Sequence, residues 1–192
     1  MAILGDYIEL VDIRNADKRF GVDSLKGISI DKKLTPTKAN VNSLDVKGYK
    51  ILRKNWFAYS PVTSRNGNKI SIAINDGEDC IISAINPVFR IKDESILEPN
   101  YIMMLFRRPE FDRYARFHSW GSARETFDWD ELCDVRIPLP SYEAQKSIVA
   151  IANSMAQRKK YSDKISSLLS DICPILIRGS LLEAQGGSPN AD

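Results

Sequence analysis

The segment Val135-Arg136-Ile137-Pro138-Leu139-Pro140-Ser141 divides the chain into two parts. Apolar residues alternate with other residues as far as Pro140, which favours a short β-strand that is stopped by prolines. Ser141 then offers an N-cap side chain, and Glu143 puts a negative charge into the first turn of a helix. We therefore expect one domain over residues 1–140 and a long helix over residues 141–184.

The predicted long helix carries a heptad pattern that begins at Ile148 and includes ten positions up to residue 179. A helix of roughly 30 residues extends about 45 Å, so this apolar face needs a partner helix. Packing of the helix back onto its own domain is the alternative. Arg158, Ser162 and Gly179 interrupt the pattern. The apolar positions are Ile148, Ile151, Met155, Ile165, Leu169, Ile172 and Leu176.

Two features near the end of the chain limit this helix. Pro174 lacks a backbone N–H group, so we expect the helix to kink or break near that residue. The stretch Gly186-Gly187-Ser188-Pro189-Asn190 is typical of a flexible tail, which predicts disorder over residues 185–192.

The first 140 residues combine short β-type runs with few helices, which predicts an α+β fold with a mixed, β-rich domain. Ile70-Ser71-Ile72-Ala73-Ile74 alternates with period two and predicts a strand with one buried face. Further short β-type runs cover residues 80–85 and 88–91. A helix is expected over residues 101–106, preceded by Pro99-Asn100 and followed by Arg107-Arg108, which suit a helix C-terminus. Pro109 either kinks this helix or starts a second one.

Composition excludes several kinds of chemistry. The 192 residues carry a net charge of +2, one histidine and three scattered cysteines, and they contain neither a P-loop nor a GxGxxG motif. We therefore expect no metal site, no bound cofactor and no catalytic residues. No apolar run is long enough to span a membrane, and the N-terminus lacks the features of a signal peptide. These features predict a cytoplasmic protein with reduced thiols.

Two polar loops are the strongest candidates for contact with DNA. One is Ser64-Arg65-Asn66-Gly67-Asn68-Lys69, and the other is Ser119-Trp120-Gly121-Ser122-Ala123-Arg124-Glu125, which ends an arginine-rich stretch. Arginine and asparagine side chains pair bidentately with guanine and adenine. The candidates for base or backbone contact are Arg65, Asn66, Asn68, Lys69, Ser122 and Arg124. The lesser candidates for phosphate contact are Arg113, Arg116, Lys18 and Arg19.

An ordered series of short motifs over about residues 4–183 resembles a target-recognition domain, namely that of the specificity (S) subunit of type I restriction-modification systems. The series includes Leu4-Gly5-Asp6, Phe57-Ala58-Tyr59, Phe111-Asp112-Arg113-Tyr114, Gly121-Ser122-Ala123-Arg124 and Ile137-Pro138-Leu139-Pro140 with Gln145. The order and spacing of these motifs, rather than any one of them, make the resemblance specific.

The resemblance implies a non-catalytic subunit that recognises a sequence in double-stranded DNA. In that family, a full S subunit has two recognition domains and two conserved helices that pack antiparallel and set the distance between half-sites. This chain resembles one half, which implies a homodimer through the C-terminal helix. The implied partners are modification subunits, which methylate adenine with S-adenosylmethionine, and, through them, restriction subunits, which use ATP.

Two other functions remain open from the residues. Residues 125–134 contain five acidic residues and no basic one, and Asp128 and Glu131 would share a helical face. A small magnesium-dependent nuclease would use such carboxylates. The long helix also suits a protein-interaction adaptor without any role in DNA binding.

Overall fold

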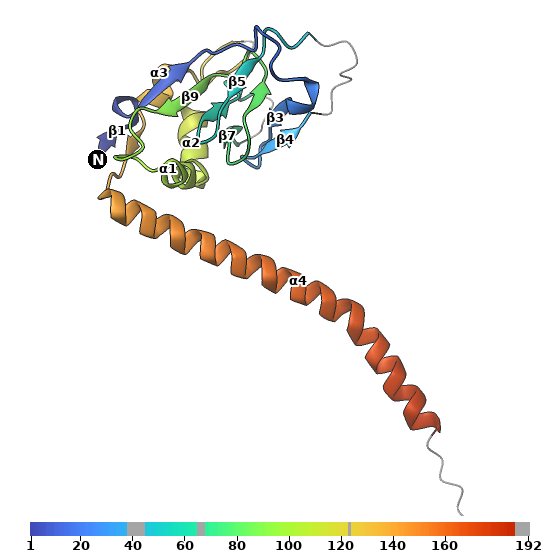
Figure 1. Cartoon of the computed structure of the whole chain (residues 1–192). Coiled ribbons are helices and arrows are strands. Elements are labelled where there is room, and N and C mark those ends of the chain that lie inside the picture. Colours follow the sequence, from blue (N-terminus) through green and yellow to red (C-terminus); the bar gives the residue numbers. More distant parts are fainter. Residues whose placement is uncertain (38–44, 65–67, 123, 187–192) are drawn as a thin grey trace, which may run out of the picture. The chain divides into compact units, whose positions relative to one another are not determined.

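The backbone divides into two units, Met1–Ser147 and Ile148–Asp192. The computed structural model describes residues 1–37, 45–64, 68–122 and 124–186 (Figure 1). The first unit is α+β, and the second consists of helix in its described part. The division falls seven residues after the predicted boundary, because the first turn of the long helix is bonded to the first unit.

The strands of the first unit are short and pair antiparallel throughout the described residues. The largest sheet has the order β2-β9-β6-β7, and the two-stranded sheets are β1-β10, β3-β4 and β5-β8. Leu4–Asp6 and Val22–Ser24 form 3-10 helices. The strands are β1 (Ala2–Ile3), β2 (Ile8–Val11), β3 (Lys26–Ile28), β4 (Leu34–Pro36), β5 (Lys50–Leu52), β6 (Phe57–Tyr59), β7 (Ile72–Ile74), β8 (Cys80–Ile82), β9 (Val88–Ile91) and β10 (Arg136–Ile137).

Proline begins two of the helices that the structure describes in the first unit. Helix α1 (Pro99–Phe106) and helix α2 (Pro109–Phe117) each begin with proline, whose fixed φ suits the first helical turn. The helix predicted from Tyr101 is present but begins two residues earlier, at Pro99, and Pro109 starts a second helix rather than kinking the first. Helix α3 (Trp129–Cys133) follows a hairpin and leads toward β10.

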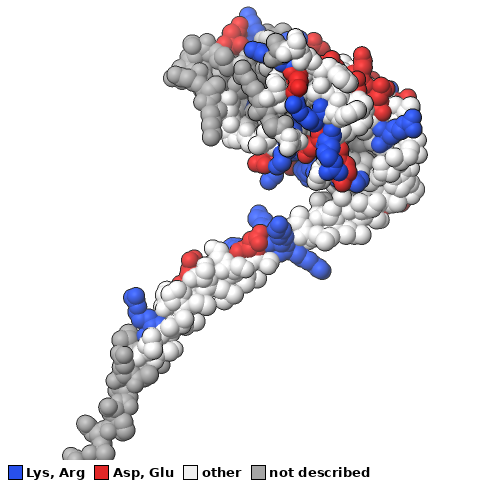
Figure 2. Space-filling view, turned by 180° about the vertical axis from the view of Figure 1, so that it is seen from behind, with Lys and Arg blue, Asp and Glu red and all other residues white. Residues whose placement is uncertain are grey.

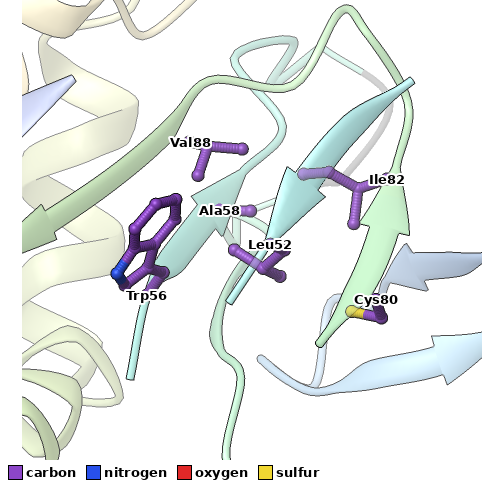
Figure 3. Close-up of a cluster of buried hydrophobic side chains, with 6 residues drawn as sticks. All are labelled: Leu52, Trp56, Ala58, Cys80, Ile82 and Val88. Atoms are coloured by element: carbon purple, nitrogen blue, oxygen red, sulfur yellow. The ribbon is translucent and has the colours of Figure 1, made fainter. Parts of the chain in front are cut away.

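The core of the first unit forms where the small sheets face one another. Figure 3 shows buried side chains from β5, β6, β8 and β9 that point into one cluster, together with the indole of Trp56. A second group is aromatic: Phe57 and Phe89 stack at 5.0 Å between ring centroids, and Phe106 meets both rings edge-on. Aromatic pairs of this kind stabilise a core beyond the area that they bury. The cluster in Figure 3 consists of Leu52, Trp56, Ala58, Cys80, Ile82 and Val88.

The prediction of one buried face for the strand near Ile70 is wrong. Ser71 and Ala73 are buried, as are the isoleucines that alternate with them. Helix α1 packs against β7, so both faces of this strand are covered. The alternating pattern shows only which side chains are polar. Both faces of β7 are buried because α1, which follows later in the chain, packs on it.

Helix α4 (Tyr142–Gly186) begins at the predicted cap. The Oγ atom of Ser141 accepts a hydrogen bond from the Ala144 N–H at 3.4 Å, which confirms its role as the N-cap. The buried Gln145 amide donates to the carbonyls of Ile96 and Pro140 and accepts from the Glu98 N–H, each at 2.9 Å. One side chain therefore ties the first turn of α4 to two other segments of the first unit.

The whole of α4 is a single helix of 45 residues, about 68 Å long at 1.5 Å per residue. Pro174 lies inside the helix, and Figure 1 shows that the axis bends in the C-terminal part. Residues 185 and 186 are helical, two residues beyond the predicted end. Residues 187–192 of the predicted disordered tail lie outside the described part of the chain. Within the described residues, no helix is long and apolar enough to cross a membrane.

Candidate nucleic-acid interface

A tight hairpin over residues 120–126 carries the second polar loop. The Trp120 N–H donates to the Thr126 carbonyl at 3.0 Å, and the Thr126 N–H donates back at 2.8 Å. Gly121 has a φ of 135°, and a Cβ atom at this position would lie 2.2 Å from the Arg124 carbonyl oxygen. The hairpin therefore requires glycine, both for its backbone conformation and for the space beside it. Ser122 and Arg124 are exposed at its tip.

The hairpin is bonded to the segment that leads into the first polar loop. The Thr63 N–H donates to the Glu125 carbonyl at 3.0 Å, and the Phe127 N–H donates to the Pro61 carbonyl at 2.8 Å. The hydroxyl of Thr63 adds a bond to the same Glu125 oxygen at 3.2 Å. These bonds bring together two loops that are about 60 residues apart in the sequence.

A buried ion pair supports the end of the first loop. The Asp112 carboxylate accepts from Lys32 at 2.7 Å and from the Ile70 N–H at 3.1 Å. Lys32 is only 5% exposed, and its ammonium also donates to the Phe106 carbonyl. Burial lowers the pKa of Lys32, and the contact with Asp112 opposes that shift. Asp112 therefore joins α2 both to Lys32 and to Ile70, which lies two residues before β7.

The acidic run after the hairpin folds back onto the arginine-rich stretch. Arg116 forms an ion pair with Glu125, and the Glu131 carboxylate meets both His118 Nδ1 at 2.6 Å and the Trp120 indole N–H at 3.3 Å. Figure 2 accordingly shows basic and acidic side chains interspersed on the visible face of the first unit. The local excess of arginine in the sequence therefore does not become a uniformly basic surface there.

The predicted DNA-contact residues lie in four places: on the two adjoining loops, on α2, on a separate loop, and outside the described residues. Asn68, Lys69, Ser122 and Arg124 are exposed on the two adjoining loops. Asn68, Lys69 and Arg116 line one shallow depression together with Thr63, whereas Arg113 is exposed on α2, 3.6 Å from Glu110. Arg65 and Asn66 lie outside the described residues.

Lys18 and Arg19 lie on a different loop. The Lys18 ammonium is 3.8 Å from Asp45, and the Arg19 guanidinium lies over the Phe20 ring at 5.6 Å. Asn15, at the start of the same turn, is bonded to the segment near β5 rather than to the hairpin. These two residues remain predictions for phosphate contact, separate from the paired loops.

Two exposed aromatic residues beside the hairpin were not among the predicted site residues. Phe117 is 75% exposed at the end of α2, and Trp120 is 59% exposed where the hairpin begins. Their position in a basic, aromatic stretch was visible in the sequence. Aromatic residues of this kind are commonly buried, so sequence alone gave no reason to place them at the surface.

The acidic residues considered for a nuclease have other roles here. Asp128 occupies the N-cap position of α3, and Glu131 is engaged by His118 and Trp120. Within the described residues, no group of three or more His, Cys, Asp or Glu side chains is arranged to hold a metal ion.

We expect the substitution Gly121→Ala to disturb the hairpin tip without unfolding the domain. The added Cβ would collide with the Arg124 carbonyl, so the tip must change conformation and displace Ser122 and Arg124. Binding of a specific duplex should fall at least as far as it does for Arg124→Ala, while the melting temperature changes by only a few degrees. Gly48→Ala is the control, because a Cβ there meets no atom within 4 Å. Equal binding by both variants would contradict this role of Gly121.

Solved structures from type I restriction-modification systems have a similar overall fold. One, from work on complex assembly and conformational transition of the type I R-M system, matches with a TM-score of 0.53 and 18% identity over 81% of this chain. The crystal structure of the HsdS subunit from Thermoanaerobacter tengcongensis matches with a TM-score of 0.50 and 18% identity over 82% of this chain. The chain spans 37% of each of those chains. The fold is thus the one seen in HsdS. No family model and no curated protein sequence matches.

Proposed function

We propose that this chain is a DNA sequence-recognition subunit of a type I restriction-modification complex. In this proposal it directs adenine methylation and restriction, while partner modification and restriction subunits carry out the chemistry. The observation that carries the proposal is the pairing of the two polar loops through Thr63 and Glu125, on a fold shared with HsdS.

The hairpin has a suitable form for reading base edges. The major groove of B-DNA admits a two-stranded β-ribbon as well as a helix. Arg124 is exposed at the ribbon tip, and among the described residues none forms an ion pair with it, so its guanidinium is available for a base or phosphate. Asn68 and Lys69 on the adjoining loop would reach neighbouring positions of the same half-site.

The second part of the proposal is an antiparallel homodimer through α4, which also docks the modification subunits. The seven apolar heptad residues are between 39% and 66% exposed. Figure 2 shows long uncharged stretches along the helix on either side of a basic group. A second copy of the helix would cover this apolar stripe and place two recognition domains at a fixed spacing.

Selection from a random duplex library tests the proposed function directly. The complex is assembled from this chain and its modification subunits, and bound duplexes are recovered and sequenced. We expect enrichment of a short motif repeated at a fixed spacing. Recovery without any enriched motif would overturn the proposal and favour a protein-interaction adaptor.

We expect the substitution Arg124→Ala to weaken binding of the selected duplex by about 1–3 kcal/mol, if this arginine pairs bidentately with a base. Arg136→Ala is the matched control, because it removes the same charge from an exposed position on β10. Fluorescence anisotropy at one fixed salt concentration measures both variants, since affinity for DNA depends strongly on salt. Equal losses for the two variants would reduce Arg124 to a general electrostatic contribution.

A further inference from the structure

Phe117 and Trp120, called the aromatic pair below, are two exposed residues that the contacts proposed so far do not use. They are three residues apart, at the end of α2 and the start of the hairpin, and both rings are more than half exposed. His118 connects them through Glu131: its ring centroid is 5.2 Å from that of Phe117, and its Nδ1 lies 2.6 Å from the Glu131 carboxylate, which also accepts from the Trp120 indole. The His118 ring stacks on Tyr114 at 4.1 Å. Leaving two large apolar side chains in water is unfavourable unless a ligand covers them.

The indole of Trp120 is held in place from two directions. Its backbone exchanges two hydrogen bonds with Thr126, and its N–H donates to Glu131 Oε1 at 3.3 Å. Glu131 is itself placed by His118 Nδ1 at 2.6 Å. Because the single polar atom of the indole is already engaged, the surface that remains exposed is ring carbon. Phe117 presents only carbon, so the pair suits an apolar contact rather than hydrogen bonding.

The pair is continuous with the proposed DNA interface. Trp120 opens the hairpin whose tip carries Ser122 and Arg124, and Phe117 directly follows Arg116 on α2. Exposed guanidinium groups of Arg113 and Arg124 flank the pair in sequence, which favours a polyanion as the ligand. The apolar group that B-DNA presents at a base edge in its major groove is the thymine methyl.

We infer that Phe117 and Trp120 form an apolar surface that contacts thymine methyl groups in the target duplex. This inference rests on the proposed function and adds a requirement on its substrate, namely that the half-site contains an A·T pair facing the hairpin. Insertion of the rings between bases fits less well, because the bonds of Trp120 to Thr126 and Glu131 fix the indole beside the strand.

Removal of single methyl groups from the DNA tests this contact. Each thymine in the selected duplex is replaced in turn by uracil, which keeps every hydrogen-bonding group and lacks only the methyl. Burial of one methyl corresponds to about a fourfold change in affinity. We expect at least one uracil position to weaken binding of the assembled complex by about that factor.

The same scan is repeated with the double variant Phe117→Ser and Trp120→Gln. Glutamine keeps an N–H donor for Glu131 while removing the ring, and both positions are exposed, so the domain should remain folded. Ile85→Ser is the matched control, because Ile85 is an exposed apolar residue outside the hairpin. We expect the uracil effect to disappear in the double variant and to persist in the control.

Each other outcome overturns the inference. The methyl contact is contradicted if uracil weakens binding equally in all variants, or if it does not weaken binding by the wild type. An increase of 2-aminopurine fluorescence on binding that the double variant abolishes would show base unstacking instead. Loss of modification-subunit assembly with an unchanged uracil effect would assign the pair to a protein contact. If the wild-type complex still binds a specific sequence, these outcomes contradict only the thymine-methyl contact and not the proposed function. Absence of any sequence preference would contradict both the methyl contact and the proposed function.

Discussion

Replacement of Lys32 by methionine is expected to lower the free energy of unfolding by about 3–5 kcal/mol. Methionine has a similar length but no charge, so the Asp112 carboxylate, which is 12% exposed, loses its counterion. Asp112 still accepts from the Ile70 N–H, which holds it in the buried position. Urea denaturation of the purified protein, followed by circular dichroism, measures the change.

Two further variants separate the buried charge from other effects of this substitution. Lys33→Met is the control, since the neighbouring Lys33 is exposed and should change stability by less than about 0.5 kcal/mol. Asp112→Asn added to Lys32→Met should recover much of the loss, because the asparagine side chain can still accept from Ile70 but carries no charge. Equal stability of Lys32→Met and Lys33→Met would show that the pair does not stabilise the fold.

The second large effect is expected on α4, where Ile165→Asp together with Leu169→Asp should abolish the proposed dimer. The two side chains lie one turn apart on the apolar stripe and are 57% and 54% exposed. Covering an aliphatic side chain contributes about 1.5–3 kcal/mol, so the double change should raise the dimer dissociation constant at least about 100-fold. Sedimentation equilibrium over a range of concentrations measures the dissociation constant.

The control for this experiment lies on the opposite side of the same helix. Ser167→Asp adds a negative charge about 180° from the stripe, so the dimer should persist. A wild-type chain that is monomeric at all concentrations would contradict homodimerisation. A dimer that survives both substitutions in the stripe would place its interface elsewhere.

Local signals in the sequence indicated α1 and α4 and offered α2 as one of two alternatives, whereas α3 and the two 3-10 helices were not predicted. Pro99 and Pro109 each begin a helix, and the Ser141 side chain caps α4. These signals act within one helical turn, so their outcome depends little on the remainder of the chain. The α+β class followed from the same reading, since short β-type runs and few helices precede the long helix.

The strands and the candidate site depended on residues far apart in the sequence. The alternating pattern at Ile70 did not reveal that α1 would cover the second face of β7. The arginine-rich and acidic runs were both visible in the sequence. The ion pair between Arg116 and Glu125 required the hairpin to turn back toward α2. Arg124 is also exposed, and among the described residues none forms an ion pair with it.

By itself, the sequence determined a β-rich domain, its capped helices and a long C-terminal helix with an apolar stripe, because caps, prolines and periodicity act over short distances. Only the tertiary structure decided that the two polar loops lie together. The bonds that join them link Thr63 to Glu125, which are 62 residues apart. Pairing at that separation depends on the packed core between the segments, and no local pattern in either loop encodes it.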